Sequence, residues 1–180
     1  MAEYFYEGHF NASRITDSIQ NVLNESRTFN RWSSRTSVFI SHKHDDLNEI
    51  SGFIGFLRNL GVDTYIDAFD PTLPNYTCGE TAKRIKERIQ QCDRFMFLAT
   101  DNAIASKWCN WELGIGDVHK YKDKIAIVPI KNWDRTSYTG SEYLEIYPYL
   151  VVSNGAYFIK DVTTSSFYPK MTPLRTWLQQ

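Results

Sequence analysis

The sequence predicts an α/β domain in which a parallel sheet of five strands, in the order 2-1-3-4-5, carries helices on both faces. Two observations favour this fold. Short apolar runs that are typical of strands alternate with segments in which apolar residues recur every three or four positions, as on one face of a helix. The links between these segments are short, which favours parallel strands joined by right-handed crossovers. With 180 residues, 42% of them hydrophobic, the chain can bury one core without a disulfide or a metal.

Residues 1–35 are predicted to form a helical extension, and the main domain is predicted over 36–180. Four apolar residues between Ile15 and Leu23 recur at helical spacing within a stretch that is otherwise polar and aromatic. A polar connector over 30–36 follows. The predicted helix has two interpretations: it packs on the main domain, or it binds a partner.

The main domain is predicted to alternate strands and helices along its whole length. Strands are expected at 38–40, 62–67, 94–100, 124–130 and 156–159. Helices are expected at 47–60, 81–91, 107–121, 142–147 and 173–178. Gly61 ends the first helix, and the prolines at 71 and 74 keep the segment 69–78 irregular. The run over 94–100 is apolar almost throughout, as in a central strand that is covered on both faces.

This strand order also predicts where a ligand binds. In open parallel sheets ligands bind beyond the carboxyl ends of the strands, at the point where the strand order reverses. For the order 2-1-3-4-5 that point lies between the first and third strands. The ligand-binding loops are therefore expected at 41–46 and 101–107.

Composition and short motifs argue against several classes of protein. The balance of 20 Lys and Arg against 21 Asp and Glu argues against a nucleic-acid binder, and the longest apolar runs are too short for a membrane helix. Glu3 and Glu7 stand where a secretory signal would carry positive charge. The three cysteines are odd in number and lack C-x-x-C spacing, so we expect a cytoplasmic protein without a disulfide framework. Dinucleotide, P-loop and serine-hydrolase fingerprints are absent from the sequence.

The polar loop after the first predicted strand has three interpretations. His42 and His44 could bind a metal, but no third histidine lies nearby. Asp45, Asp46 and Asp101 superficially fit a phosphoacceptor receiver domain, although the first two lie four and five residues past the strand. A polar loop over a substrate pocket is the interpretation that we favour.

The segment over 106–113, with the sequence SKWCNWEL, is the most informative part of the chain. Ser106 is predicted to cap the helix that follows the third strand. Trp108 and Glu112 are four residues apart, so they lie on one face of this helix, one turn from each other. An indole can stack on a flat cationic ring, and a carboxylate can stabilise positive charge that develops on a sugar carbon. The alternative interpretation is a surface glutamate beside a half-buried tryptophan.

Other residues of the same helix are predicted to face the core. Trp111, Ile115 and Val118 form a second stripe at helical spacing. Gly114 and Gly116 are predicted to permit close packing, at a cost in helix propensity of roughly 1 kcal/mol each.

Four segments resemble TIR (Toll/interleukin-1 receptor) domains. The run SVFIS at 37–41 resembles the first-strand box of that family, and YID at 65–67 resembles the end of its second strand. The proline-bearing segment 68–78 occupies the place of the BB loop. The pattern S-x-W-C-x-x-E-L at 106–113 is similar to the helix motif of TIR domains that cleave NAD. The resemblance covers about residues 36–160.

The resemblance implies a three-layer flavodoxin-like fold and an enzyme for which NAD⁺ is a substrate and not a cofactor. It implies that Glu112 is the catalytic residue and that Trp108 contacts the substrate. It also implies four further substrate-binding residues, namely Ser41, His42, Lys43 and Asp67. The products would be nicotinamide and either linear or cyclic ADP-ribose.

The resemblance also implies partners. The histidine-bearing first loop and the YPY segment at 147–149 are similar to stand-alone bacterial TIR proteins of anti-phage defence. Such proteins associate through TIR–TIR contacts, and a downstream effector senses their product. Neither a nucleic acid nor a membrane is expected as a partner. The alternative function is a non-catalytic adaptor module that acts through TIR–TIR contacts alone.

Overall fold

The computed structural model describes residues 4–13, 34–70, 73–74, 77–132, 141–162 and 169–180. The described strands are β1 (Phe5–Tyr6), β2 (Ser37–Ser41), β3 (Asp63–Tyr65), β4 (Arg94–Ala99), β5 (Ile125–Lys131), β6 (Tyr149–Ser153), β7 (Ala156–Lys160) and β8 (Met171–Pro173). The α-helices are α2 (Leu47–Asn59), α3 (Gly79–Gln91), α4 (Asp101–Ala105), α5 (Lys107–His119) and α6 (Leu174–Gln179). Short 3₁₀ helices are η1 (His9–Ser13), η2 (Asp67–Phe69), η3 (Lys122–Lys124) and η4 (Glu142–Ile146).

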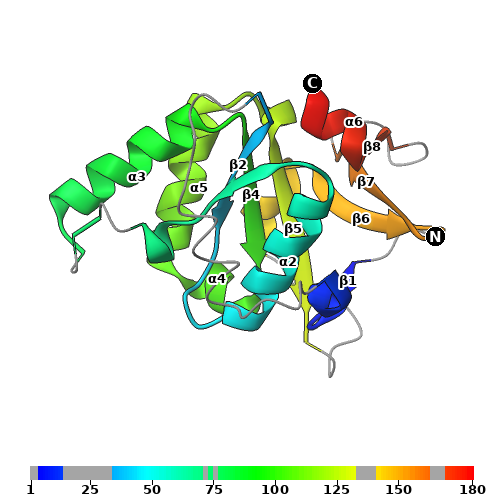
Figure 1. The fold of residues 1–180 in the computed structure, drawn as a ribbon, viewed down its shortest axis with the longest axis horizontal. Helices are drawn as coiled ribbons and strands as arrows, with labels where there is room; N and C mark the ends of the chain where they lie inside the picture. The colour runs from blue at the N-terminus through cyan, green and yellow to red at the C-terminus, as the bar shows by residue number, and fades with distance from the viewer. Residues whose placement is uncertain (1–3, 14–33, 71–72, 75–76, 133–140, 163–168) are drawn as a thin grey trace.

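One mixed sheet in the order β3-β2-β4-β5-β6-β7-β8 forms the centre of the domain (Figure 1). The pairs from β3 to β6 are parallel, which confirms the predicted order 2-1-3-4-5. The fifth parallel strand is β6, however, and not the segment predicted at 156–159. That segment forms β7, which runs antiparallel to β6. The reason is a tight turn at Asn154 and Gly155, whose φ angles of 50° and 73° suit a two-residue hairpin.

Helices cover both faces of the sheet. Successive residues of a strand point to opposite faces. Accordingly, Val38 and Ile40 of β2 pack in the core with α2 and α6, whereas Phe39 packs in the core with α3 and α5. The ring of Phe39 stacks on that of Phe95 at 5.5 Å. Figure 1 shows α3 and α5 side by side, on the opposite side of the sheet from α6.

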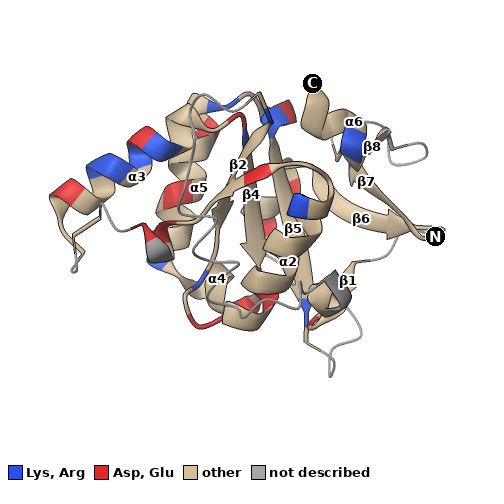
Figure 2. Ribbon diagram, in the orientation of Figure 1, with Lys and Arg blue, Asp and Glu red and all other residues tan. Residues whose placement is uncertain are grey.

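The outer face of α3 carries charges of both signs. Figure 2 shows Lys and Arg interspersed with Asp and Glu along this helix. Arg84 and Glu80, one turn apart, form an ion pair of 2.9 Å. Ile85 and Ile89 are fully buried on the inner face. The helix therefore presents a solvated, mixed-charge face outward.

The described N-terminal residues belong to the same sheet and core. Strand β1 runs parallel to β5, with Phe5 opposite Ile130. Phe10 is buried against α2, where Gly52 permits a close approach: a Cβ atom at Gly52 would lie 2.9 Å from the Phe10 carbonyl oxygen. The helix predicted between Ile15 and Leu23 lies outside the described residues, and the division of the chain at residue 35 stays a prediction.

Several other predicted elements differ from the observed ones in extent. The second strand is shorter than predicted and is followed by η2. The loop predicted at 101–107 contains the short helix α4, which Thr100 caps by accepting a hydrogen bond from the Ala103 amide at 3.1 Å. Among the described residues, no helix is long and apolar enough to cross a membrane.

Candidate active site

Helix α5 packs on the carboxyl end of β2, and these two elements form a buried polar contact. Ser106 caps α5 as predicted, accepting a hydrogen bond from the Cys109 amide at 3.3 Å. The helix then carries Glu112 inward, where its side chain is 1% exposed. Ser41, the last residue of β2, donates a hydrogen bond of 2.6 Å from Oγ to Oε2 of Glu112. The predicted catalytic residue and one predicted substrate-binding residue are therefore in direct contact.

The environment of Glu112 opposes its charge. Burial raises the pKa of this carboxyl well above its usual value, and the nearby negative charge of Asp67 raises it further. The Ser41 hydroxyl and the Trp108 indole act in the opposite direction. Oε1 of Glu112 has no hydrogen-bond partner among the described residues. The free protein thus holds a buried carboxyl with one unused acceptor.

His42 is a second buried polar group with an unused acceptor. Its Nδ1 lies 3.1 Å from the carbonyl oxygen of Ile40. Because a carbonyl can only accept, Nδ1 carries the hydrogen and Nε2 carries the lone pair. Nε2 is buried without a hydrogen-bond partner in the described part of the chain. Burial lowers the pKa of His42, although the Asp67 carboxylate, 3.9 Å from Nδ1, acts against this effect. The imidazole is therefore held neutral in a single tautomer.

The remaining predicted site residues surround these two groups. Asp67, the first residue of η2, is buried and lies near both His42 and Glu112. Trp108 is half-buried, with its ring 5.0 Å from that of Trp111. Lys43 is partly exposed, and its Nζ lies 3.8 Å from Asp45. The structure thus brings all six predicted residues to the same edge of the sheet, with Lys43 at its rim.

Cys109 also contributes to this site, although no role is predicted for it. Its thiol donates a hydrogen bond of 3.1 Å to the carbonyl oxygen of His42. Burial raises the pKa of this thiol to about 11, so it remains protonated and can donate. No signal in the sequence identifies the contact, because the two residues are 67 positions apart.

The predicted core stripe of α5 is correct for two residues and wrong for the third. Trp111 and Ile115 are half-buried and pack against the core, whereas Val118 is 76% exposed. The inward face instead consists of Cys109, Glu112, Leu113 and Gly116. Gly116 does permit close packing, because a Cβ atom there would lie 3.1 Å from the Phe95 ring, but Gly114 is exposed with open space around it. The prediction fails in part for this helix because Glu112, a polar residue, lies on its buried face.

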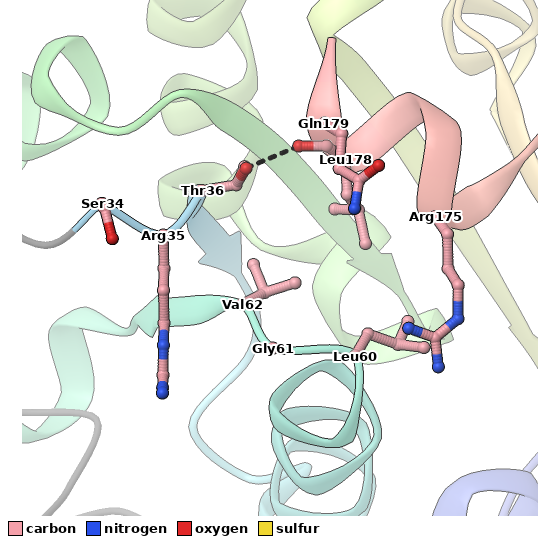
Figure 3. A pocket seen from close by; sticks show the side chains of 9 residues that line it. All are labelled: Ser34, Arg35, Thr36, Leu60, Gly61, Val62, Arg175, Leu178 and Gln179. Carbon is pink, nitrogen blue, oxygen red and sulfur yellow. Dashed lines mark hydrogen bonds between the residues drawn. The ribbon is translucent and has the colours of Figure 1, made fainter.

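A separate hollow of about 220 Å³ lies at the opposite end of the strands (Figure 3). It is bordered by Arg35 and Thr36 before β2, by Gly61 after α2, and by Arg175 and Gln179 of α6. The two arginine side chains come from opposite sides of the hollow (Figure 3). The Thr36 hydroxyl donates a hydrogen bond to the carbonyl oxygen of Leu178, which also borders the hollow. None of the predicted site residues borders this hollow.

The parallel order of the sheet defines a class: a doubly wound α/β domain, here with a buried carboxyl at the switch point of the strand order, where ligands bind in such sheets. The sequence profile of the TIR domain family matches residues 38–149. The probable 3′ cyclic ADP-D-ribose synthase ThsB′ of Bacillus cereus (strain MSX-D12) is 30% identical over 178 residues, which is 96% of this chain and 89% of that protein. The chain therefore belongs to the TIR domain family.

A second relative matches a smaller part of the chain. The putative cyclic ADP-D-ribose synthase TIR2 of Cytobacillus dafuensis is 33% identical over 79 residues. This match covers 42% of the present chain and 21% of that protein.

Proposed function

We propose that this chain cleaves the bond between nicotinamide and ribose in NAD⁺ and releases nicotinamide together with a cyclic ADP-ribose, or linear ADP-ribose when water attacks. The observation that carries the proposal is the Glu112 carboxyl, buried at the switch point beside Trp108 with Oε1 unpartnered among the described residues. The names of the two relatives, both cyclic ADP-D-ribose synthases, support the same reaction.

The electrostatics of the site favour a cationic substrate. Glu112 and Asp67 repel each other, and burial already raises the pKa of Glu112. The nicotinamide ring of NAD⁺ carries a positive charge, which would favour the ionised form of Glu112 and offset this repulsion. Substrate binding would thereby favour the carboxylate that the reaction requires.

One carboxylate is sufficient for this bond cleavage. When the carbon–nitrogen bond breaks, its electron pair goes to the ring nitrogen, and nicotinamide leaves as a neutral base without a general acid. Positive charge develops on the sugar carbon, and the Glu112 carboxylate stabilises it. A hydroxyl or the adenine ring of the same molecule then attacks that carbon to close a ring, or a water molecule attacks it to give the linear product.

The other predicted residues would bind and orient the substrate. Trp108 would stack on the cationic ring. The neutral imidazole of His42, with its unused Nε2 acceptor, is suited to a hydroxyl or amide donor of the substrate. Lys43 at the rim would contact the diphosphate. Asp67 and Ser41 would set the charge and orientation of Glu112.

Glu112→Gln tests the proposal. The variant keeps the shape and the hydrogen-bonding capacity of the side chain but removes its charge, so nicotinamide release from NAD⁺ should fall by at least about a hundredfold. Release is measured by chromatography at high protein concentration, because assembly would favour activity in this family. Glu87→Gln, an exposed glutamate of α3, is the matched control and should leave activity unchanged. Full activity of Glu112→Gln would remove the catalytic role.

Self-association is proposed as well. Three large apolar side chains are exposed near the end of α5 and on η4, namely Val118 at 76%, Tyr121 at 80% and Ile146 at 51%. Asp117 of α5 lies close enough to Tyr147, which follows η4, to raise the pKa of that phenol, so η4 lies beside this part of α5. Such a cluster supports contact with another protein surface. Sedimentation of the wild type and of Val118→Lys over a range of concentrations tests this contact, and equal sedimentation at every concentration would exclude it.

The cellular role follows from the reaction. We propose that the cyclic product signals to a downstream effector in anti-phage defence and that the protein acts in the cytoplasm, where its substrate is available. The three free cysteines of the chain are consistent with a reducing compartment. Nicotinamide release in vitro without any cyclic product would contradict the signalling role.

A further inference from the structure

The Asp46 side chain forms its hydrogen bonds outside its own helix. Asp46 occupies the N-cap position of α2, where a carboxylate ordinarily accepts a hydrogen bond from the first turn of its own helix. Here the side chain makes no such bond. Oδ2 instead accepts from the Thr100 hydroxyl at 2.5 Å, and Oδ1 accepts from the Asn102 amide at 2.8 Å. The carboxylate thus bridges the loop after β2 to the start of α4, 54 and 56 residues further along the chain.

Thr100 makes this bridge rigid. Its hydroxyl has one hydrogen, which it donates to Asp46, and it accepts a hydrogen bond from the Ala103 amide at 3.1 Å. The same oxygen therefore caps α4 and anchors Asp46. Because Thr100 directly follows β4, whose residues are all buried, the anchor is fixed to the centre of the sheet. The position of Asp46 is in this way tied to β4.

The loop over 42–46 is consequently held at two points. At one end the Cys109 thiol donates to the carbonyl of His42 at 3.1 Å. At the other end the Asp46 amide donates to the carbonyl of Lys43 at 2.9 Å and closes a turn. Lys43 lies between these anchors. Its direction over the site therefore depends on where Asp46 is held.

We propose that Asp46 is a positioning residue for NAD⁺: its bridge to Thr100 and Asn102 holds the 42–46 loop so that His42 and Lys43 meet the substrate. This inference rests on the proposed function. Glu112 is carried by α5 and bonded to Ser41, neither of which belongs to the bridge. Loss of the bridge should therefore weaken substrate binding and leave the chemical step intact.

A pair of variants separates the bridge from the charge. Asp46→Ala removes both hydrogen bonds, and KM for NAD⁺ should rise about tenfold while kcat stays within about twofold. Asp46→Asn can keep both bonds, because its oxygen accepts from Thr100 and the Asn102 amide can turn its own oxygen toward the new donor. Its KM should stay within about threefold of the wild-type value. A purely structural role would instead reduce the active fraction and lower kcat without raising KM.

Asp93→Ala is the matched control. The Asp93 carboxylate accepts two hydrogen bonds from Ser37, at 2.8 Å from the amide and 2.7 Å from the hydroxyl, at the opposite end of β2. This variant also loses two hydrogen bonds, so its stability should fall while its KM stays unchanged. Equal KM values for Asp46→Ala and the wild type, or a KM increase in Asp93→Ala of the same size, would overturn the inference.

Hydrogen exchange provides a readout that does not depend on turnover. In Asp46→Ala the amides over 42–46 should exchange at least about tenfold faster, whereas those of β4 should not change. Unchanged exchange in the loop would refute the bridge as its anchor. If the wild type releases no nicotinamide, both the proposed function and the substrate role of Asp46 fail. An active wild type with an unaltered KM in Asp46→Ala refutes the substrate role alone.

Discussion

Removing the hydrogen bond between Ser41 and Glu112 tests quantitatively how this contact sets the pKa of Glu112. Ser41→Ala removes the donor that faces Oε2 at 2.6 Å and leaves the carboxyl buried beside Asp67. A hydrogen bond to a charged group is worth roughly 1.5–3 kcal/mol. Since one pKa unit corresponds to about 1.4 kcal/mol, the pKa of Glu112 should rise by a further one to two units or so.

The direction of the effect on activity follows from the charge that Glu112 needs. The carboxylate is the active form, so kcat/KM rises with pH through the pKa of Glu112 in the free enzyme. In Ser41→Ala this acid limb should move to higher pH by about one to two units, with activity recovering above the new limb. The assay is nicotinamide release from NAD⁺ at low substrate concentration between pH 5 and about pH 10.

Ser37→Ala is the control for this experiment. Ser37 lies in the same strand, and its hydroxyl bonds to Asp93 at 2.7 Å, away from the site. Its pH profile should match that of the wild type. An acid limb in Ser41→Ala that stays in place, or that moves to lower pH, would refute the assignment of Glu112 as the titrating group.

Three further predictions concern stability and reactivity. Burial raises the pKa of Glu112 in the folded state, so the unfolded chain binds fewer protons than the folded one. The free energy of unfolding therefore falls as pH rises above about 4.5. Glu112→Gln should raise Tm by several degrees at neutral pH, as measured by calorimetry. Gly114→Ala, on open helix surface, should stabilise by about 0.5–1 kcal/mol, whereas Gly116→Ala should destabilise because its Cβ meets a core phenylalanine ring at 3.1 Å; urea unfolding of both compares them. Cys78, whose pKa is lowered by hydrogen bonds from Thr81, should react with iodoacetamide before Cys109, whose pKa burial raises to about 11, as peptide mass spectrometry would reveal. A higher unfolding temperature for the wild type than for Glu112→Gln, equal effects of the two glycine variants, or simultaneous alkylation would contradict the respective prediction.

The parallel core could be predicted because its signals are local. Each buried strand is a short apolar run, and each helix has its own periodicity and its own stop signal, such as Gly61 after α2. The antiparallel hairpin differs from the predicted fifth parallel strand at 156–159. Asn154 and Gly155 between two apolar runs are a strong hairpin signal, and the hairpin forms there.

The site could be predicted only in part, because spacing within one helix says which residues share a face but not which face is buried. The four-residue spacing of Trp108 and Glu112 placed both correctly on one face of α5. The same reasoning failed for Val118, since the core beneath α5 accepts a carboxyl that bonds to Ser41. Contacts such as that of Asp46 with Thr100 join residues 54 positions apart, and one sequence holds no local trace of them.

The two ends of the sheet bear on how copies of this protein could associate. Among the described residues the sheet ends at β3 on one side and at β8 on the other, and each of these strands is three residues long. Strand β8 also contains Pro173, which has no amide hydrogen to offer a neighbour. A strand of a second copy could therefore form few backbone hydrogen bonds with either of these strands. Any assembly of several copies would have to be built from side chains on helices and loops, so that single surface substitutions would govern its length.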